Sequence, residues 1–228
     1  METKEIIRKN VQVALLPLAI MVILTGCTNE SSNPEWVSVE LTKMNVIYLG
    51  VDNPVIIASS NHKGDMLEVT IDNGTITGTN DNIMIRPEKA GKATIKISSN
   101  GDIIGEKTLR VLSLPNPTAG IKAEVDGQTK FMIKDGISLK TLLETDEVHA
   151  ELKDFLWDAE FKVVSFNLVV TNRGITKVEK SASNQFTEGQ KDLLKTTGPG
   201  QIIILEDVNA IGPDGLIRKL NDITLKIM

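Results

Sequence analysis

The sequence has little of what many stabilising and catalytic sites need, with one cysteine and two histidines among 228 residues. A single cysteine cannot form a disulfide within the chain, so packing alone must stabilise it, as domains of about 100 residues can do. His62 and His149 lie too far apart in the sequence to form a paired-histidine metal motif. We therefore interpret both as ordinary loop or surface histidines and predict no metal site.

Aromatic and basic residues are also scarce. Only 4% of the residues are aromatic, whereas sugar-binding sites usually present exposed aromatic faces. The formal net charge is -5, and no basic stripe interrupts the acidic balance. Because an acidic protein repels the phosphate backbone, nucleic acid is not an expected partner.

The sequence motifs of common enzymes are missing. There is no Gly-x-Ser-x-Gly nucleophile motif, and Gly91-Lys92 lacks the upstream glycine of a phosphate-binding loop. The carboxylates show no calcium-binding spacing, and we interpret Asp135-Gly136 and Asp214-Gly215 as turns. We predict that the chain is not an enzyme and has neither catalytic residues nor a cofactor.

No apolar run is long enough to cross a membrane comfortably. The run from Val13 to Leu24 has twelve residues and would reach about 18 Å as a helix, against roughly 30 Å of hydrocarbon. Basic residues precede it and small residues follow it, which is typical of a secretory signal peptide. We assign residues 1–26 to such a peptide.

The cysteine directly follows this segment, in the sequence Leu24-Thr25-Gly26-Cys27. This sequence resembles the lipobox of bacterial lipoproteins, in which the cysteine receives a diacylglycerol and becomes the new N-terminus. The resemblance implies lipidation of Cys27 and a membrane partner through that lipid; the alternative is an exported domain with a chance free thiol. The next residue is not the aspartate that retains some lipoproteins in an inner membrane, so we expect the outer membrane, on either its periplasmic or its surface side.

The pattern changes twice after this point. Residues 27–35 are polar, without apolar periodicity, and predict a flexible tether. Short alternating apolar and polar runs, separated by turn residues, then predict about seven strands and an immunoglobulin-like β-sandwich over residues 36–113. Within it, Asp72-Asn73-Gly74 predicts a hairpin turn, and Trp36 and Tyr48 are expected in the core.

A second domain begins at Leu114-Pro115-Asn116-Pro117, because these prolines resist both helix and central strand. Residues 114–228 hold several further strand patterns and predict a mixed, β-rich domain with one or two short helices. One helix is expected to begin after Ser138. The other should begin at Thr187, in capping-box form, and end at Gly198-Pro199.

Three finer expectations concern this domain. The strand pattern from Phe161 to Val170 changes its inward face near Val163, which predicts a bulge or burial on both faces. The turn Gly212-Pro213-Asp214-Gly215 should join two antiparallel strands, with Glu206-Asp207 facing Arg218-Lys219 across them. Phe155 and Trp157 are expected in a core or at a domain or subunit contact.

Several stretches together resemble the C-terminal domains of the GldM family, also called PorM, from the gliding-motility and type IX secretion machinery of Bacteroidetes. They are, in order, Asn45 to Val55, Leu114 to Pro117, Phe161 to Phe166, and Leu205 to Leu220. The resemblance implies an immunoglobulin-like domain, a mixed, mostly β domain, elongated homodimers and a binding role without catalytic residues. Family members begin with a spanning helix and a helical periplasmic domain, and we expect neither here.

The resemblance and Cys27 together predict a non-catalytic cell-envelope lipoprotein that presents a GldM-like protein-interaction module, associated with a gliding or type IX secretion-like complex. Its expected partners are envelope proteins and a second copy of the chain in a homodimer. A second hypothesis stays open here: a surface-exposed glycan-binding or adhesive lipoprotein with tandem β-sandwich domains.

Overall fold

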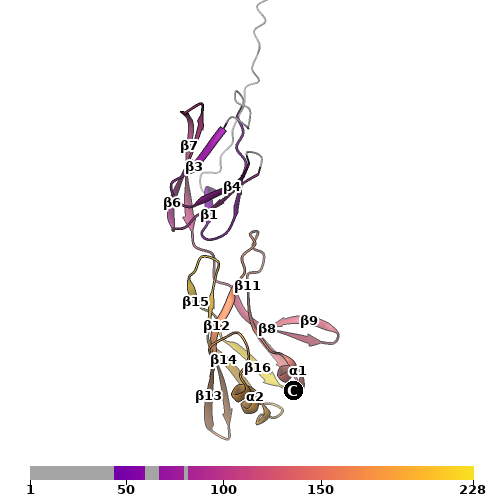
Figure 1. Ribbon diagram of the computed structural model, residues 1–228. Helices are drawn as coiled ribbons and strands as arrows, with labels where there is room; N and C mark the ends of the chain where they lie inside the picture. Colours follow the sequence, from indigo (N-terminus) through magenta and orange to yellow (C-terminus); the bar gives the residue numbers. More distant parts are fainter. Residues whose placement is uncertain (1–43, 60–66, 80–81) are drawn as a thin grey trace, which may run out of the picture. The chain divides into compact units, whose positions relative to one another are not determined.

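The computed structural model describes residues 44–59, 67–79 and 82–228 (Figure 1). The described part holds sixteen strands and two helices, which confirms the predicted, mostly β fold class. The predicted signal peptide, Cys27, the tether, Trp36 and His62 lie outside these residues.

The first seven strands form an immunoglobulin-like pair of sheets, in the orders β1-β7-β6-β3 and β2-β5-β4. Alternation along each strand creates the core between the sheets. In β5, for example, Ile83 and Ile85 are buried while Asn82 and Arg86 are exposed. The strands are β1 Val46–Tyr48, β2 Asn53–Val55, β3 Leu67–Ile71, β4 Thr75–Thr79, β5 Asn82–Arg86, β6 Gly91–Ser99 and β7 Asp102–Leu112.

The turn at Asp72-Asn73-Gly74 is not a hairpin turn, contrary to the prediction. It carries the chain from β3 in one sheet to β4 in the other. The Asn73 amide donates to the carbonyls of Lys89 (2.8 Å) and Lys92 (3.0 Å) and thereby fastens the turn to the β5–β6 connection. Residues that accept positive φ predict a turn, but they do not predict which strands it pairs.

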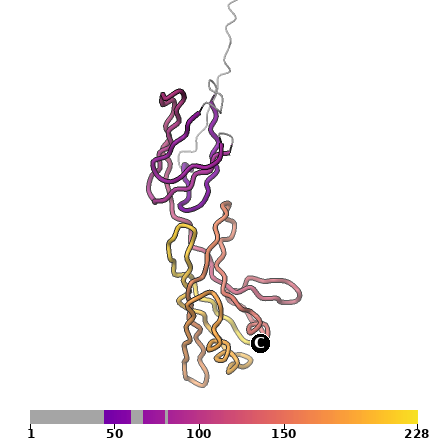
Figure 2. The backbone as a smooth tube through the Cα atoms, viewed as in Figure 1, coloured from indigo at the N-terminus to yellow at the C-terminus, as the bar shows by residue number. Residues whose placement is uncertain are grey.

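The C-terminal domain contains a large sheet, ordered β10-β16-β14-β12-β13 with β15 paired to β14, and a small sheet, ordered β11-β8-β9. β8 and β9 form a hairpin that projects from the rest of this domain (Figure 2). The strands are β8 Thr118–Val125, β9 Gln128–Met132, β10 Lys134–Ile137, β11 Val148–Glu151, β12 Lys162–Asn172, β13 Ile175–Ser181, β14 Ile202–Ile211, β15 Ile217–Lys219 and β16 Ile223–Ile227.

One core joins the large sheet, the small sheet and the two helices, α1 Leu139–Glu144 and α2 Glu188–Lys195. Leu142 of α1 and Leu194 of α2 are fully buried in it, together with Phe166 of β12. Side chains of one face of the large sheet therefore enter the core, while those between them point the other way.

The helix starts are confirmed by their caps. The Ser138 hydroxyl accepts from the Thr141 amide at 3.0 Å. Thr187 and Gln190 form the predicted capping box, with reciprocal hydrogen bonds of 3.2 and 3.0 Å. The end of α2 differs from the predicted Gly198-Pro199, because the helix already stops at Lys195 and the positive φ that follows it belongs to Gly200.

Irregular pairing of β12 and β14 confirms the predicted bulge. The register shifts between Val163 and Ser165 and again between Ser165 and Asn167, opposite Asp207 with its φ of 50°. The interpretation of Asp135-Gly136 as a turn is wrong, since both residues lie in β10 and pair in parallel with β16. A parallel partner distant in sequence overrides the local turn preference.

The Gly212 to Gly215 turn joins β14 to antiparallel β15, as predicted, but only half of the expected cross-strand pairing forms. Lys219 contacts Asp207 at 2.5 Å. Arg218 instead pairs with Asp214 inside the turn, through one hydrogen bond of 2.9 Å and a second, shorter one. Arg218 does not face Glu206 or Asp207 because its side chain points the other way. It pairs with buried Ala210 and lies on the same inward face of the sheet.

A small third cluster contains the aromatic residues of two chain segments. The ring of Tyr48 lies 5.0 Å from Phe155 and 4.8 Å from Trp157, centroid to centroid. Leu114 and Phe161 are buried in the same cluster. The prediction that Tyr48 belongs to the first core is therefore wrong, because Tyr48 packs against this third cluster. Phe155 and Trp157 pack against the same cluster, which agrees with their expected core role.

Stretches that carry the GldM resemblance meet beside this cluster. Gly50 has a φ of 75°, and a Cβ built on it would lie 2.6 Å from the backbone of Asp214. Arg218 also donates to the carbonyl of Leu114 at 3.3 Å. The turn before β2, the proline-rich segment and the turn after β14 thus constrain one another.

Candidate functional site

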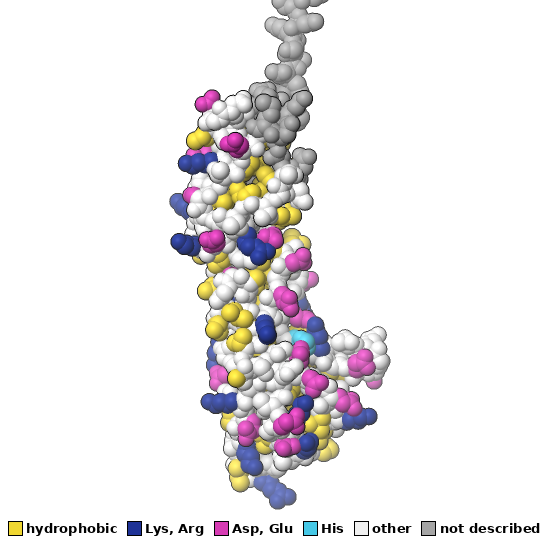
Figure 3. Space-filling view, in the orientation of Figure 1, with side chains coloured by type: hydrophobic (Ala, Val, Ile, Leu, Met, Phe, Trp, Pro, Cys, Tyr) yellow, Lys and Arg dark blue, Asp and Glu magenta, His cyan; other side chains and the backbone are white. Residues whose placement is uncertain are grey.

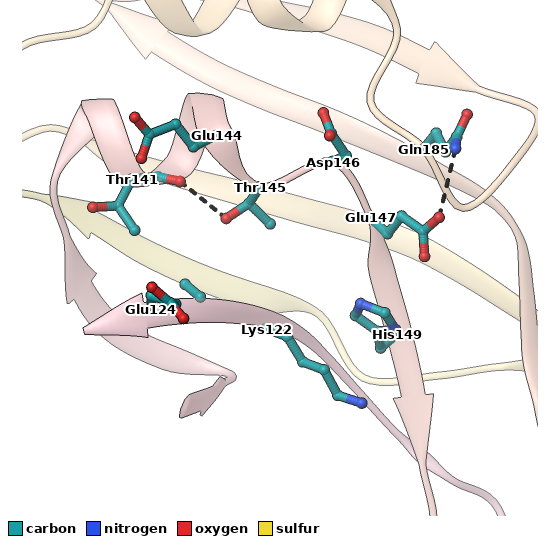
Figure 4. A pocket seen from close by; sticks show the side chains of 10 residues that line it. Lys122, Glu124, Thr141, Glu144, Thr145, Asp146, Glu147, His149 and Gln185 are labelled. Carbon is teal, nitrogen blue, oxygen red and sulfur yellow. Dashed lines mark hydrogen bonds between the residues drawn. The ribbon is translucent and has the colours of Figure 1, made fainter. Parts of the chain in front are cut away.

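The C-terminal domain carries a polar cavity of about 580 Å³ between β8, β11 and the end of α1 (Figure 4). Lys122 of β8 and His149 of β11 line one side, and Glu144, Glu147 and Gln185 are among the residues of the other. A second cavity of about 670 Å³ shares Lys122 and His149 with it. Acidic side chains gather on the visible face of this domain (Figure 3).

Burial and neighbouring charges lower the pKa of His149. Burial lowers its pKa first, and the positive charge of Lys122 lowers it further, while Glu147 and Glu151 act in the opposite direction. Lys122 itself contacts Glu151 at 2.6 Å. The imidazole of His149 therefore takes up a proton at a lower pH than an exposed histidine does.

The two threonine hydroxyls that line the cavity are engaged in local hydrogen bonds. The Thr141 hydroxyl shares a 2.7 Å hydrogen bond with Ser138, and the Thr145 hydroxyl donates to the Thr141 carbonyl at 3.0 Å. Nucleophilic catalysis needs a hydroxyl or thiol hydrogen-bonded to a base, and neither hydroxyl contacts His149 in this way. No group of three metal-ligating side chains occurs in the described part of the chain.

The predicted site residues have different outcomes. Cys27 and His62 lie outside the described residues. His149 lies on strand β11, so it is not a loop histidine, but it is half-exposed and lines two cavities, which agrees with the surface alternative of the prediction. Sequence reasoning missed this cavity because its walls come from separate strands whose register no local pattern gives.

Apart from half-buried Phe131, the aromatic side chains of the described residues are buried or packed against another ring. Phe161, Phe166 and Phe186 are buried, and Tyr48 and Trp157 are half-buried against each other. A glycan-binding surface usually offers an open aromatic ring. Among the described residues, Phe131 is the ring outside these contacts, and the Lys153 amino group lies over it at 5.9 Å from the ring centroid.

Hydropathy of the helices adds one observation. Neither described helix is long and apolar enough to cross a membrane.

Comparison with known proteins identifies the two folded parts. Residues 36–112 match the model of the GldM third domain, and residues 115–228 match that of the GldM C-terminal domain. No curated protein matches the chain.

Among solved structures, the adhesin InvE of Yersinia pseudotuberculosis is similar at 14% identity and a TM-score of 0.23. The match covers 71% of this chain and 48% of the adhesin, so the chain spans about half of that structure's length and the likeness supports no conclusion about function. The two domain models, in contrast, follow each other in order over nearly all of residues 36–228, and the chain therefore belongs to the GldM family through its third and C-terminal domains.

Proposed function

We propose that the chain is a non-catalytic lipoprotein of the cell envelope that presents GldM-like domains for protein contacts in a gliding or type IX secretion-like complex. The observation that carries this proposal is the pair of family matches over residues 36–112 and 115–228. The polar cavity supports a binding role over a catalytic one, because its hydroxyls are committed to structural hydrogen bonds.

The proposed anchor is a lipid on Cys27. In this arrangement residues 1–26 are a signal peptide, residues 27–35 a tether, residues 36–113 the immunoglobulin-like domain and residues 114–228 the C-terminal domain. The eight tether residues after the cysteine reach at most about 28 Å, so the folded part stays close to its membrane. We propose the outer membrane as that membrane.

The anchor restricts which part of the family's role applies. An acyl chain sits in one leaflet and cannot transmit motion from across a bilayer, unlike a spanning helix. The proposed role is therefore binding to other envelope proteins, by a homodimer, and excludes that of a motor shaft.

The test is affinity purification of the full chain from native membranes, with chemical crosslinking before solubilisation. We expect reproducible recovery of envelope proteins and of a second copy of the chain. Recovery of the chain without any envelope protein would contradict the proposed function.

A further inference from the structure

The large sheet of the C-terminal domain has two unlike faces. On one, Phe166, Leu168 and Ile203 are fully buried in the core. On the other, strand register places Val178, Val169 and Ile204 side by side in one row across β13, β12 and β14. Side chains alternate along a strand, so this row points away from the core.

An apolar patch lies at the centre of this outer face. Val178 is 46% exposed and Ile202 is 54% exposed, and Val169 and Ile204 between them are half-buried. None of the four belongs to a hydrophobic cluster formed by the described residues. Adjoining exposed apolar side chains of this kind mark interaction sites more often than isolated ones do.

Lysines frame the patch, and we call the whole surface the lysine-framed face. Thr224 of β16 pairs with Ile204 on one side and with Lys134 on the other, so Lys134 lies in the same row as Ile204. Lys226 pairs with Ile202. Lys180 lies across the patch from them, on β13.

The charges on the lysine-framed face are not balanced. Lys134, Lys180 and Lys226 form no ion pair with any residue that the structure describes, although the charge of Lys180 contributes to the lowered pKa of Asp207. Glu206 shares the row of Lys180, while Asp207 is neutralised by Lys219. Three lysines against the carboxylates of Glu206 and Asp222, both close enough to act on Lys219, leave a formal charge of +1, opposite in sign to the -5 of the chain.

These charges select the kind of partner. A second copy would bring the same lysines together, and like charges across an interface are costly. Surfaces that lie on membranes insert Trp, Phe or Leu side chains, whereas the centre of this face has only valine and isoleucine. A protein surface with an apolar centre and acidic rim fits both features.

We propose that the lysine-framed face is the docking surface for a separate envelope protein that presents an apolar centre flanked by aspartate and glutamate. This inference rests on the proposed function and names the surface and the partner chemistry that the function uses. The apolar contacts supply binding, and the lysines steer and orient the partner.

The test places a photo-crosslinking amino acid at Val178 or Ile202 of the full chain in native membranes. Both positions should give the same protein adduct, and the crosslinked partner peptide should be rich in acidic residues. The triple variant Lys134→Glu, Lys180→Glu and Lys226→Glu should reduce the adduct yield about tenfold or more. The matched control, Lys92→Glu with Lys130→Glu and Lys140→Glu, changes the charge equally elsewhere and should leave the yield unchanged.

Several results would overturn the proposal. These are the absence of a protein adduct at both positions, an adduct with lipid or with a second copy, or a triple variant that crosslinks like its control. A third crosslinker at Ile103, 63% exposed on β7, separates this failure from that of the proposed function. A protein adduct at Ile103 alone would refute the docking face and leave the proposed function standing, whereas no protein adduct at any position contradicts both.

Discussion

At the residue scale, the buried pair of Asp214 and Arg218 makes a sharp prediction about stability. Their side chains are 0% and 8% exposed, and Arg218 also holds the Leu114 carbonyl. Asp214→Asn should lower the free energy of unfolding by about 3 kcal/mol, because it leaves a buried guanidinium without its counter-charge. Urea denaturation measures this change, with Asp52→Asn as the control.

The control removes a pair of the same type from an exposed site. Asp52 and Arg86 contact each other at 2.8 Å but are 50% and 54% exposed. Solvent screens such a pair, so its loss should change stability little. Equal destabilisation by the two variants would show that burial of Asp214 does not matter.

The same pair predicts a pH dependence. Burial by itself raises the pKa of Asp214, but hydrogen bonds from Arg218 and the Leu216 backbone bring the pKa below its ordinary value of 3.8. The unfolded chain therefore takes up this proton first as the pH falls. The stabilisation is present above about pH 4 and is lost as the pH drops through the folded pKa. Denaturation between about pH 5 and 2 should show a shallower loss of stability in Asp214→Asn than in the natural chain.

Gly50 provides a second residue-scale prediction. Gly50→Ala should destabilise the fold by more than about 1 kcal/mol, because it adds backbone contact to the strain of a positive φ. Gly127 has nearly the same φ, 73°, but a Cβ placed there would meet no atom within 4 Å, so Gly127→Ala carries the conformational strain alone. Thermal unfolding should rank Gly50→Ala below Gly127→Ala, and the reverse order would rule out the close approach.

At the element scale, the capping box of α2 links local sequence to the core. Thr187→Ala should lower the free energy of unfolding by about 1 kcal/mol, since it removes the acceptor for the backbone N–H of Gln190 at the helix start. Thr187→Ser keeps that acceptor and should restore most of the stability. Urea denaturation of the two variants measures the difference, and identical midpoints would mean that the cap contributes nothing.

Elements whose cause is local were predictable from the sequence. Ser138, Thr187 and the Gly212 to Gly215 turn act through neighbours within a few residues, and the structure confirms all three. Pairings between distant segments were not predictable. Asp135-Gly136 became a strand because β16 pairs with it.

The candidate site was less predictable than the fold, for the same reason. His149 and Lys122 are brought together by the register of β11 and β8, which the local pattern does not fix. The lysine-framed face likewise depends on four strand pairings, which bring β13, β12, β14, β16 and β10 together. The continuous apolar run Ile202-Ile203-Ile204-Leu205 gave no sign of which side chains would face outward.

At the scale of the whole molecule, the lipid anchor and the folded domains should be separable. Cys27 precedes the family-matched residues, so its replacement should remove the proposed lipid without touching the core. Each buried CH₂ of an acyl chain contributes about 0.8 kcal/mol to membrane binding. Cys27→Ser should therefore abolish labelling by an alkyne fatty acid, while limited proteolysis of residues 36–228 stays as in the natural chain. Persistent labelling of Cys27→Ser would place the lipid elsewhere, and an unlabelled natural chain would mean that the protein is held in the envelope by its protein contacts alone.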